Sequence, residues 1–123
     1  MTKHMRILIV DDDADIRDLL AESFVNAGFT VLQAGDGDAA WDVLAKETVD
    51  AVLTDIVMAP IDGFELCVRI RESWPDMPVF FMTGHPGRLS DANLLTEVFE
   101  DVLMKPFSHE LAIAKILAVL SKE

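Results

Sequence analysis

Apolar residues are distributed along this chain in two different patterns. Five short runs are mostly apolar and rich in β-branched or aromatic side chains, which is typical of strands buried on both faces of a sheet. They are RILIV (6–10), TVLQA (30–34), AVLT (51–54), VFFM (79–82) and VLM (102–104). We therefore expect a core of five strands.

The segment after the first run has the spacing of an amphipathic helix, in which apolar residues recur every three or four positions. This helix is expected to begin at Asp13 or Asp15 and to end at Gly28. Its inward face would consist of Ile16, Leu19, Leu20, Ser23, Phe24 and Ala27.

A helical pattern also follows each of the other runs. These helices are expected over 38–46, 63–73, 91–98 and 109–120. Ser90 and Ser108 immediately precede the last two, and serine is favoured at the residue that caps a helix N-terminus. Five strands that each lead into a helix predict an α/β fold, a doubly wound parallel sheet with helices on both faces.

The chain as a whole has the size and composition of a single globular domain. We find no repeat or linker in its 123 residues and treat 1–123 as one domain. The net charge of −12 argues against nucleic acid as a partner, because a polyphosphate attracts a basic surface. One cysteine, no membrane-spanning apolar run and no signal peptide favour a cytoplasmic protein.

Polar residues with chemical potential stand where the expected strands end. Three aspartates occupy 11–13 after the first strand, and Asp55, Thr83 and Lys105 follow the third, fourth and fifth. The carboxyl ends of parallel strands meet at one edge of the sheet, where ligands bind in such folds. Carboxylates without nearby His or Cys select Mg²⁺, so we expect Asp11, Asp12 and Asp55 to form part of a magnesium site.

Each of these residues also has a simpler interpretation. Asp11 and Asp12 could merely end a strand and cap a helix, and Thr83 could be a turn residue before Gly84. Lys105 could be a solvated lysine in a loop. The combination of all of them at successive strand ends favours a site.

Four motifs at these strand ends resemble the receiver domain of two-component response regulators, the CheY-like family. They are VDD (10–12), DIVMAPIDG (55–63), MTG (82–84) and KPF (105–107), in the order of that family. The resemblance covers essentially the whole chain. It implies a flavodoxin-like sheet with the strand order 2-1-3-4-5.

The resemblance also implies a role for each residue of the site. Asp55 looks like the phosphoacceptor, and Asp12 like the main Mg²⁺ ligand, with Asp11 acting mostly through water. The main-chain carbonyl of Val57 would be the third protein ligand. Because Asp55 is already ionised, it could accept a phosphoryl group without a general base.

Further residues would bind the phosphoryl group or tune its lifetime. Thr83 and Lys105 look like the hydroxyl and the ammonium that contact it, while the side chain of Val57 and His85 are candidates for tuning. Val102 stands where the family usually carries an aromatic switch residue, and Ala59 where it usually carries a proline. Signal output could therefore differ while phosphorylation is intact.

By the same resemblance, the donor would be a histidine kinase or a histidine phosphotransfer protein, and the phosphorylated state would be read by a downstream protein. The chain would modify itself rather than turn over a substrate, either as a free-standing protein or as part of a longer one. Its last helix carries an apolar stripe of Ala112, Ile116, Val119 and Leu120, which could belong to a generously apolar core helix or bury against a partner or a second copy of the chain.

Three other functions are compatible with parts of this pattern. A receiver that has lost phosphorylation could serve only as a docking module. A phosphohydrolase with an aspartyl nucleophile would want an acid two residues after Asp55, where Val57 stands. A flavin mononucleotide carrier would need a hydroxyl- or glycine-rich loop after the first strand, where the chain has three aspartates that repel phosphate.

Overall fold

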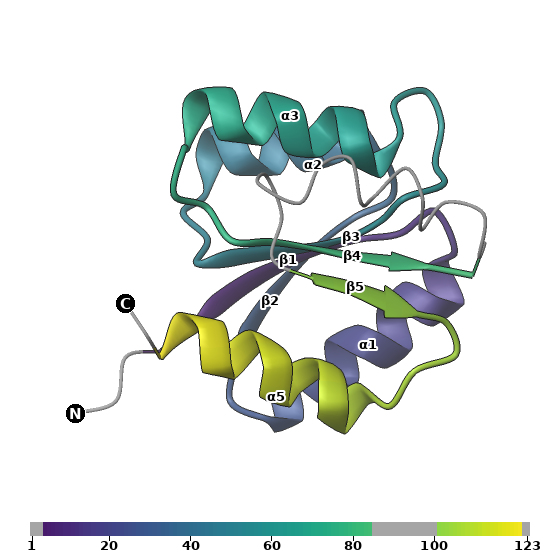
Figure 1. The fold of residues 1–123 in the computed structure, drawn as a ribbon, viewed down its shortest axis with the longest axis vertical. Helices are drawn as coiled ribbons and strands as arrows, with labels where there is room; N and C mark the ends of the chain where they lie inside the picture. Colours follow the sequence, from purple (N-terminus) through teal and green to yellow (C-terminus); the bar gives the residue numbers. More distant parts are fainter. Residues whose placement is uncertain (1–3, 85–100, 122–123) are drawn as a thin grey trace.

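The computed structural model describes residues 4–84 and 101–121, which form one parallel sheet flanked by helices (Figure 1). The strands are β1 (Arg6–Val10), β2 (Thr30–Ala34), β3 (Ala51–Asp55), β4 (Val79–Thr83) and β5 (Asp101–Met104). Their order is β2-β1-β3-β4-β5, and every neighbouring pair is parallel, as expected. β3 and β4 extend one residue further than predicted, so Asp55 and Thr83 are strand residues.

Four described helices cover the two faces of the sheet. They are α1 (Ala14–Asn26), α2 (Gly37–Lys46), α3 (Gly63–Ser73) and α5 (His109–Leu120). α2 and α3 lie on one face, and α1 and α5 lie on the other (Figure 1). The helix expected over 91–98 and its cap Ser90 lie outside the described residues.

Two apolar clusters fill the spaces between the sheet and its helices. Successive strand residues point to opposite faces, so Leu8 packs in the cluster beneath α2 and α3, and Ile9 in the cluster beneath α1 and α5. In β4, Phe81 packs in the cluster beneath α2 and α3, and Phe80 packs in the cluster beneath α1 and α5. Burial on both faces explains why the strands are apolar runs rather than alternating sequences.

A polar side chain fixes the start of each described helix. Asp36, Asp62 and Ser108 each accept a hydrogen bond from a backbone N–H of the first turn of α2, α3 and α5. Asp13 does the same for α1, accepting from the N–H groups of Asp15 and Ile16. Gly28 follows α1 with a φ of 99°, a conformation that glycine adopts without strain.

The inward face of α1 differs from the prediction at Leu19 and at Ala27, which caps the helix C-terminus and is exposed. Leu19 is 59% exposed, whereas Leu20, Ala21 and Phe24 are buried. Successive residues are rotated by about 100° around a helix. The buried face of α1 is centred on Leu20 and Phe24, so Leu19 lies at the border of this face. The small side chain of Ala21 is buried on the other side of it. The spacing of apolar residues alone does not show on which side of Leu20 the buried face of α1 extends.

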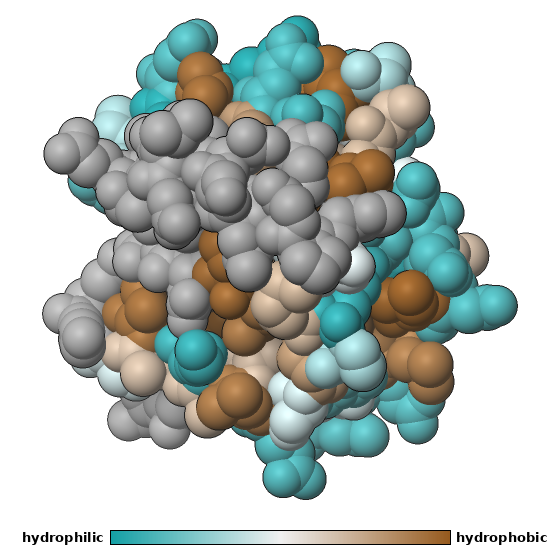
Figure 2. All heavy atoms as spheres, turned by 45° about the vertical axis from the view of Figure 1, so that its right-hand side comes forward, coloured by the Kyte–Doolittle hydropathy of each residue, from teal (hydrophilic) through white to brown (hydrophobic). Residues whose placement is uncertain are grey.

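Exposed apolar residues are scattered over the described surface. The large ones are Leu19, Val25, Val57, Val68, Leu111 and Leu117. On the face shown in Figure 2, hydrophobic residues lie in several separate places among hydrophilic ones, as is ordinary for a folded domain. None of the described helices is long and apolar enough to cross a bilayer.

The apolar stripe of the last helix is used within the chain itself. Ala112, Ile116 and Leu120 are buried in the cluster shared with α1, and Val119 packs against it. A partner of α5 would therefore contact its other side, where Leu111 and Leu117 are exposed.

Candidate functional site

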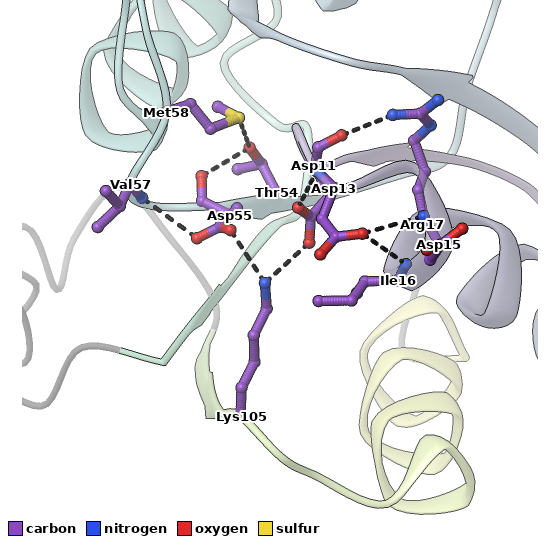
Figure 3. A network of polar contacts seen from close by, with 10 residues as sticks. All are labelled: Asp11, Asp13, Asp15, Ile16, Arg17, Thr54, Asp55, Val57, Met58 and Lys105. Carbon is purple, nitrogen blue, oxygen red and sulfur yellow. Dashed lines mark hydrogen bonds and ion pairs between the residues drawn. The ribbon is translucent and has the colours of Figure 1, made fainter.

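The ends of β1, β3 and β5 bring together Asp11, Asp55 and Lys105. The Lys105 Nζ donates hydrogen bonds to Asp11 Oδ2 at 2.8 Å and to Asp55 Oδ2 at 2.9 Å (Figure 3). β5 is separated from β3 by β4 in the sheet, so the long lysine side chain reaches across the end of β4 to the two carboxylates. The interpretation of Lys105 as a solvated loop lysine is wrong.

The site holds more negative than positive charge. Asp11 is fully buried and Asp55 is 7% exposed, while Asp12 is exposed beside them. Asp11, Asp12 and Asp55 each offer an oxygen, and these oxygens lie within 4.8 Å of one another. Among the residues that the structure describes, the Lys105 ammonium contacts two of these three carboxylates, Asp11 and Asp55. A hard divalent cation such as Mg²⁺ fits this set of oxygen donors.

Burial and charge shift the protonation of this group. Desolvation raises the pKa of Asp55, and the negative charge of Asp11 adds to this, although the hydrogen bond and charge of Lys105 oppose it. For Lys105, burial acts to lower the pKa, but the hydrogen bonds and charges of Asp11 and Asp55 outweigh it and the pKa is raised. Lys105 therefore remains an ammonium at neutral pH.

The loop after β3 holds the other oxygen of Asp55. The backbone N–H of Val57 donates to Asp55 Oδ1 at 3.2 Å, while Lys105 binds Oδ2 (Figure 3). Both oxygens thus have a fixed donor, and the plane of the carboxylate is set. The role of the Val57 carbonyl as a metal ligand stays a prediction.

Thr83 is the last residue of β4, not a turn residue. Its side chain is buried, and its carbonyl accepts a hydrogen bond of 2.8 Å from the backbone N–H of Lys105. It therefore lies at the same edge of the sheet as Asp55 and Lys105. Its contact with a phosphoryl group stays a prediction.

The two remaining candidates are placed differently. Val102 is half-buried in β5, next to Phe81 of β4, and packs against the cluster beneath α2 and α3. His85 lies outside the described residues. Their tuning and switching roles stay predictions.

Sequence reasoning missed the contribution of Gly63. A Cβ added to this residue would lie 2.3 Å from the Asp55 carbonyl oxygen and 3.0 Å from the Ile56 Cα. The Gly63 N–H also donates to the Ile56 carbonyl at 2.8 Å. The start of α3 therefore packs directly against the backbone of Asp55, which only glycine permits. The helix expected over 63–73 begins at this glycine, but its sequence pattern gives no sign of the contact with Asp55.

A second missed residue is Arg17 of α1. Its Nη1 donates to the carbonyl oxygen of Asp11 at 2.8 Å (Figure 3). Arginine on the polar side of an amphipathic helix is unremarkable in a sequence, so no signal distinguished it from a solvated side chain.

Comparison with known proteins agrees with this geometry. The sequence model of the family described as the response regulator receiver domain matches residues 7–117. The uncharacterized transcriptional regulatory protein YrkP of Bacillus subtilis is 41% identical over 117 residues, which are 95% of this chain and 50% of that protein. The response regulator MprA of Mycobacterium avium is 35% identical over 118 residues, 96% of this chain and 52% of MprA. The chain thus spans about half the length of these relatives.

Solved structures give the same result. The CheY-like receiver domain protein of Methanospirillum hungatei superimposes with a TM-score of 0.90 at 26% identity, covering 98% of this chain and 96% of that one. The response regulator TrrA of Thermotoga maritima was solved in complex with Mg²⁺ and BeF. It superimposes with a TM-score of 0.86 at 29% identity, covering 94% of this chain and 98% of that one. With its fold, its acidic edge and these relatives, the chain belongs to the response regulator receiver domain family of two-component signalling systems.

Proposed function

We propose that the chain accepts a phosphoryl group on a carboxylate oxygen of Asp55 and that the modified state changes its contacts with other proteins. The observation that carries this proposal is the double contact of Lys105 with Asp11 and Asp55 beside the exposed Asp12. This arrangement gives an ionised oxygen nucleophile, a fixed cation and further oxygen ligands at one edge of the sheet. By family membership, the donor is a phosphohistidine of a kinase or of a phosphotransfer protein.

The transfer needs little acid–base chemistry. An Asp55 oxygen attacks phosphorus, the phosphorus–nitrogen bond of the donor breaks, and the electron pair of that bond stays on the histidine nitrogen. The product is an acyl phosphate on Asp55. Phosphoryl transfer depends mainly on positioning and on balancing charge. Val57 N–H and Lys105 position the carboxylate, and the Lys105 ammonium balances charge.

The acidic residues are proposed to hold Mg²⁺. Asp11, Asp12 and Asp55 supply the carboxylate oxygens, with the Val57 carbonyl as a further ligand. When bound, the ion supplies positive charge next to the phosphoryl oxygens. The complex of the TrrA relative with Mg²⁺ and BeF supports this assignment.

A change in hydrogen bonding would carry the signal. The phosphoryl group brings a charge of roughly −1.5 to −2 to a position where Asp55 carried one. Lys105 and Thr83 can then form charge-assisted hydrogen bonds that the free protein lacks. Because both residues adjoin β5, such bonds would favour one arrangement of this edge over another.

The partners follow from the same proposal. The phosphorylated state is read by a downstream protein, and the exposed side of α5 with Leu111 and Leu117 is the surface for a second copy of the chain. The net charge of −12 disfavours direct contact of this domain with nucleic acid. DNA binding in transcriptional relatives would then belong to the half of those proteins that this chain does not match.

Intact mass spectrometry tests the proposal. The protein is incubated with Mg²⁺ and acetyl phosphate, or with a phosphorylated phosphotransfer protein, beside Asp55→Asn and the matched surface variant Asp38→Asn. We expect one added phosphoryl group in the wild type and in Asp38→Asn, and none in Asp55→Asn. No gain with either donor would instead favour a docking module, and sustained hydrolysis of a phosphate ester would favour a phosphohydrolase.

A further inference from the structure

Arg17 connects helix α1 to the ends of two strands. Its Nη1 donates to the carbonyl oxygen of Asp11, at the end of β1, over 2.8 Å, and its Nε donates to the Oε1 of Gln33, in β2, over 3.1 Å. Figure 3 shows the guanidinium reaching back toward Asp11 from the helix. The side chain therefore bridges three elements at the acidic edge of the sheet.

The acceptors of this guanidinium are neutral although carboxylates are close by. In the described part of the chain, Arg17 forms no ion pair. The Asp13 carboxylate is bound to the N–H groups of Asp15 and Ile16. The Asp11 carboxylate is bound to Lys105 and to the Asp13 N–H. Arg17 thus contributes a fixed backbone geometry rather than charge neutralisation.

The backbone that Arg17 holds leads directly to Asp12. The Asp11 carbonyl belongs to the peptide group that joins Asp11 to Asp12, and this group is planar. A donor that fixes the carbonyl oxygen therefore fixes the plane in which the Cα of Asp12 lies. The Asp11 N–H donates to the Ala34 carbonyl at 3.2 Å and holds the preceding peptide.

The Asp12 side chain has no such support of its own. It is exposed, and among residues 4–84 and 101–121 its carboxylate accepts no hydrogen bond and forms no ion pair, yet one of its oxygens lies within 4.8 Å of oxygens of Asp11 and Asp55. Its direction in the metal-free protein is therefore set by the backbone on either side.

We propose that Arg17 is a positioning residue for the cation site. It orients the Asp11–Asp12 peptide so that the Asp12 carboxylate faces Asp11 and Asp55, and Gln33 holds the guanidinium in place for this task. The inference rests on the proposed function, because it concerns the Mg²⁺ site used there.

The charge of the Arg17 guanidinium and its positioning of the backbone predict opposite changes in Mg²⁺ affinity when Arg17 is replaced. A guanidinium near a cation site repels Mg²⁺, so if charge dominates, its removal strengthens Mg²⁺ binding. If position dominates, its removal weakens Mg²⁺ binding, because groups that orient metal ligands typically change affinity by roughly 10–100-fold. The sign of the change therefore decides between the two.

The first test measures the Mg²⁺ dissociation constant by calorimetry in Arg17→Met and in Arg69→Met. The control removes the same charge and the same side chain from α3, where Arg69 pairs with Glu65 at 3.4 Å on the surface. We expect Arg17→Met to bind about tenfold more weakly than Arg69→Met, and Gln33→Ala to show a smaller loss in the same direction. Equal or tighter binding by Arg17→Met would overturn the inference.

The second test needs no metal. Amide hydrogen exchange is followed by NMR in metal-free wild type, Arg17→Met and Gln33→Ala. We expect faster exchange at the Asp13 amide, whose bond to Asp11 Oδ1 depends on this backbone, with no change at Leu53 in the centre of β3. Unchanged Asp13 exchange, or an equal rise at Leu53, would contradict a positioning role. Failure of wild type to bind Mg²⁺ would overturn the proposed function, while this exchange result would still decide whether Arg17 holds the backbone between Asp11 and Asp13.

Discussion

The interior of the sheet and the buried residues at its carboxyl edge are chemically opposite. Val10 and Asp11 are adjacent in the sequence and both have no exposed surface, and the apolar residues of β3 lead in the same way into buried Asp55. Burial of valine stabilises the fold by about 1.5–3 kcal/mol. Burial of a carboxylate opposes folding unless a charged partner compensates.

This difference indicates which residues serve stability and which serve function. Within the described ranges, 4–84 and 101–121, Lys105 is the cation paired with the buried carboxylates of Asp11 and Asp55, and the exposed Asp12 adds a third negative charge. These described residues leave the edge with an excess of negative charge, which suits it to bind a cation. Substitutions in the interior should change stability and leave the chemistry of the folded protein intact, whereas substitutions at the edge should change both.

The largest loss of stability is expected in the interior. Phe24 is fully buried and contacts Phe29 edge-to-face at 5.1 Å between ring centroids. Phe24→Ala should lower the free energy of unfolding by about 3–5 kcal/mol through lost burial and a cavity. Val25→Ala, at a neighbouring position that is 55% exposed, should change it by less than about 0.5 kcal/mol. Urea unfolding measures both, and similar losses in the two variants would contradict the assignment of the α1 faces.

A smaller loss is expected where the interior meets the edge. In Gly63→Ala, the added methyl group would force the Asp55 backbone away, with a loss of about 1–3 kcal/mol. Displacement of the nucleophile should also slow phosphorylation of the folded protein, by roughly tenfold or more. Gly84→Ala is the control for stability, since its nearest neighbour, the Lys105 Cβ, would be 3.8 Å away. Normal phosphorylation of Gly63→Ala would show that Asp55 does not depend on this contact.

Removal of the ammonium should destabilise the edge in a pH-dependent way. Lys105→Met leaves Asp11 and Asp55 without their partner, which we expect to lower the free energy of unfolding by about 1–3 kcal/mol at neutral pH. Burial raises the pKa of Asp55 even beside Lys105, and without the ammonium this pKa should rise further. The folded state then holds its proton more tightly than the unfolded state, so stability is greatest in acid and falls as the pH rises through the raised pKa.

Unfolding of Lys105→Met and wild type between pH 4 and pH 8 checks this prediction. The difference between the two proteins should grow with pH, and Mg²⁺ should reduce it at pH 7. A difference that does not vary with pH would contradict the proposal that Lys105 compensates buried carboxylates.

The smallest effect is expected from Cys67, whose thiol is buried in the interior. Burial raises the pKa of the Cys67 thiol to about 11, although the charge and hydrogen bond of Arg71 act to lower it. Above pH 9 the unfolded chain loses this proton before the folded one does, so stability should fall by about 1 kcal/mol between pH 9 and pH 10. Cys67→Ala should lack this part of the pH dependence, and identical alkaline profiles would contradict it. The chain has no tyrosine that titrates in the same range.

The sequence predicted the parallel sheet and the main site residues for physical reasons, whereas the strand order was implied by the family resemblance. Parallel strands buried on both faces are continuous apolar runs, and the residues that end them must meet at one edge. Asp11, Asp55 and Lys105 were therefore found from position alone, and the family motifs agree with them.

Features that depend on packing between elements could not be predicted in this way. The exposure of Leu19 depends on how α1 is rotated against the sheet, and the role of Gly63 depends on how closely α3 approaches β3. Arg17 acts through a backbone carbonyl, an atom that every residue has and that leaves no trace in the sequence.

A crystal structure of the protein soaked with Mg²⁺ and beryllofluoride tests the central claim most directly. The account predicts an ion held by oxygens of Asp11, Asp12 and Asp55, and beryllofluoride attached to an Asp55 oxygen and in contact with the Lys105 Nζ. An acidic edge without an ion, with the Lys105 ammonium turned into solvent and no beryllofluoride on Asp55, would contradict it.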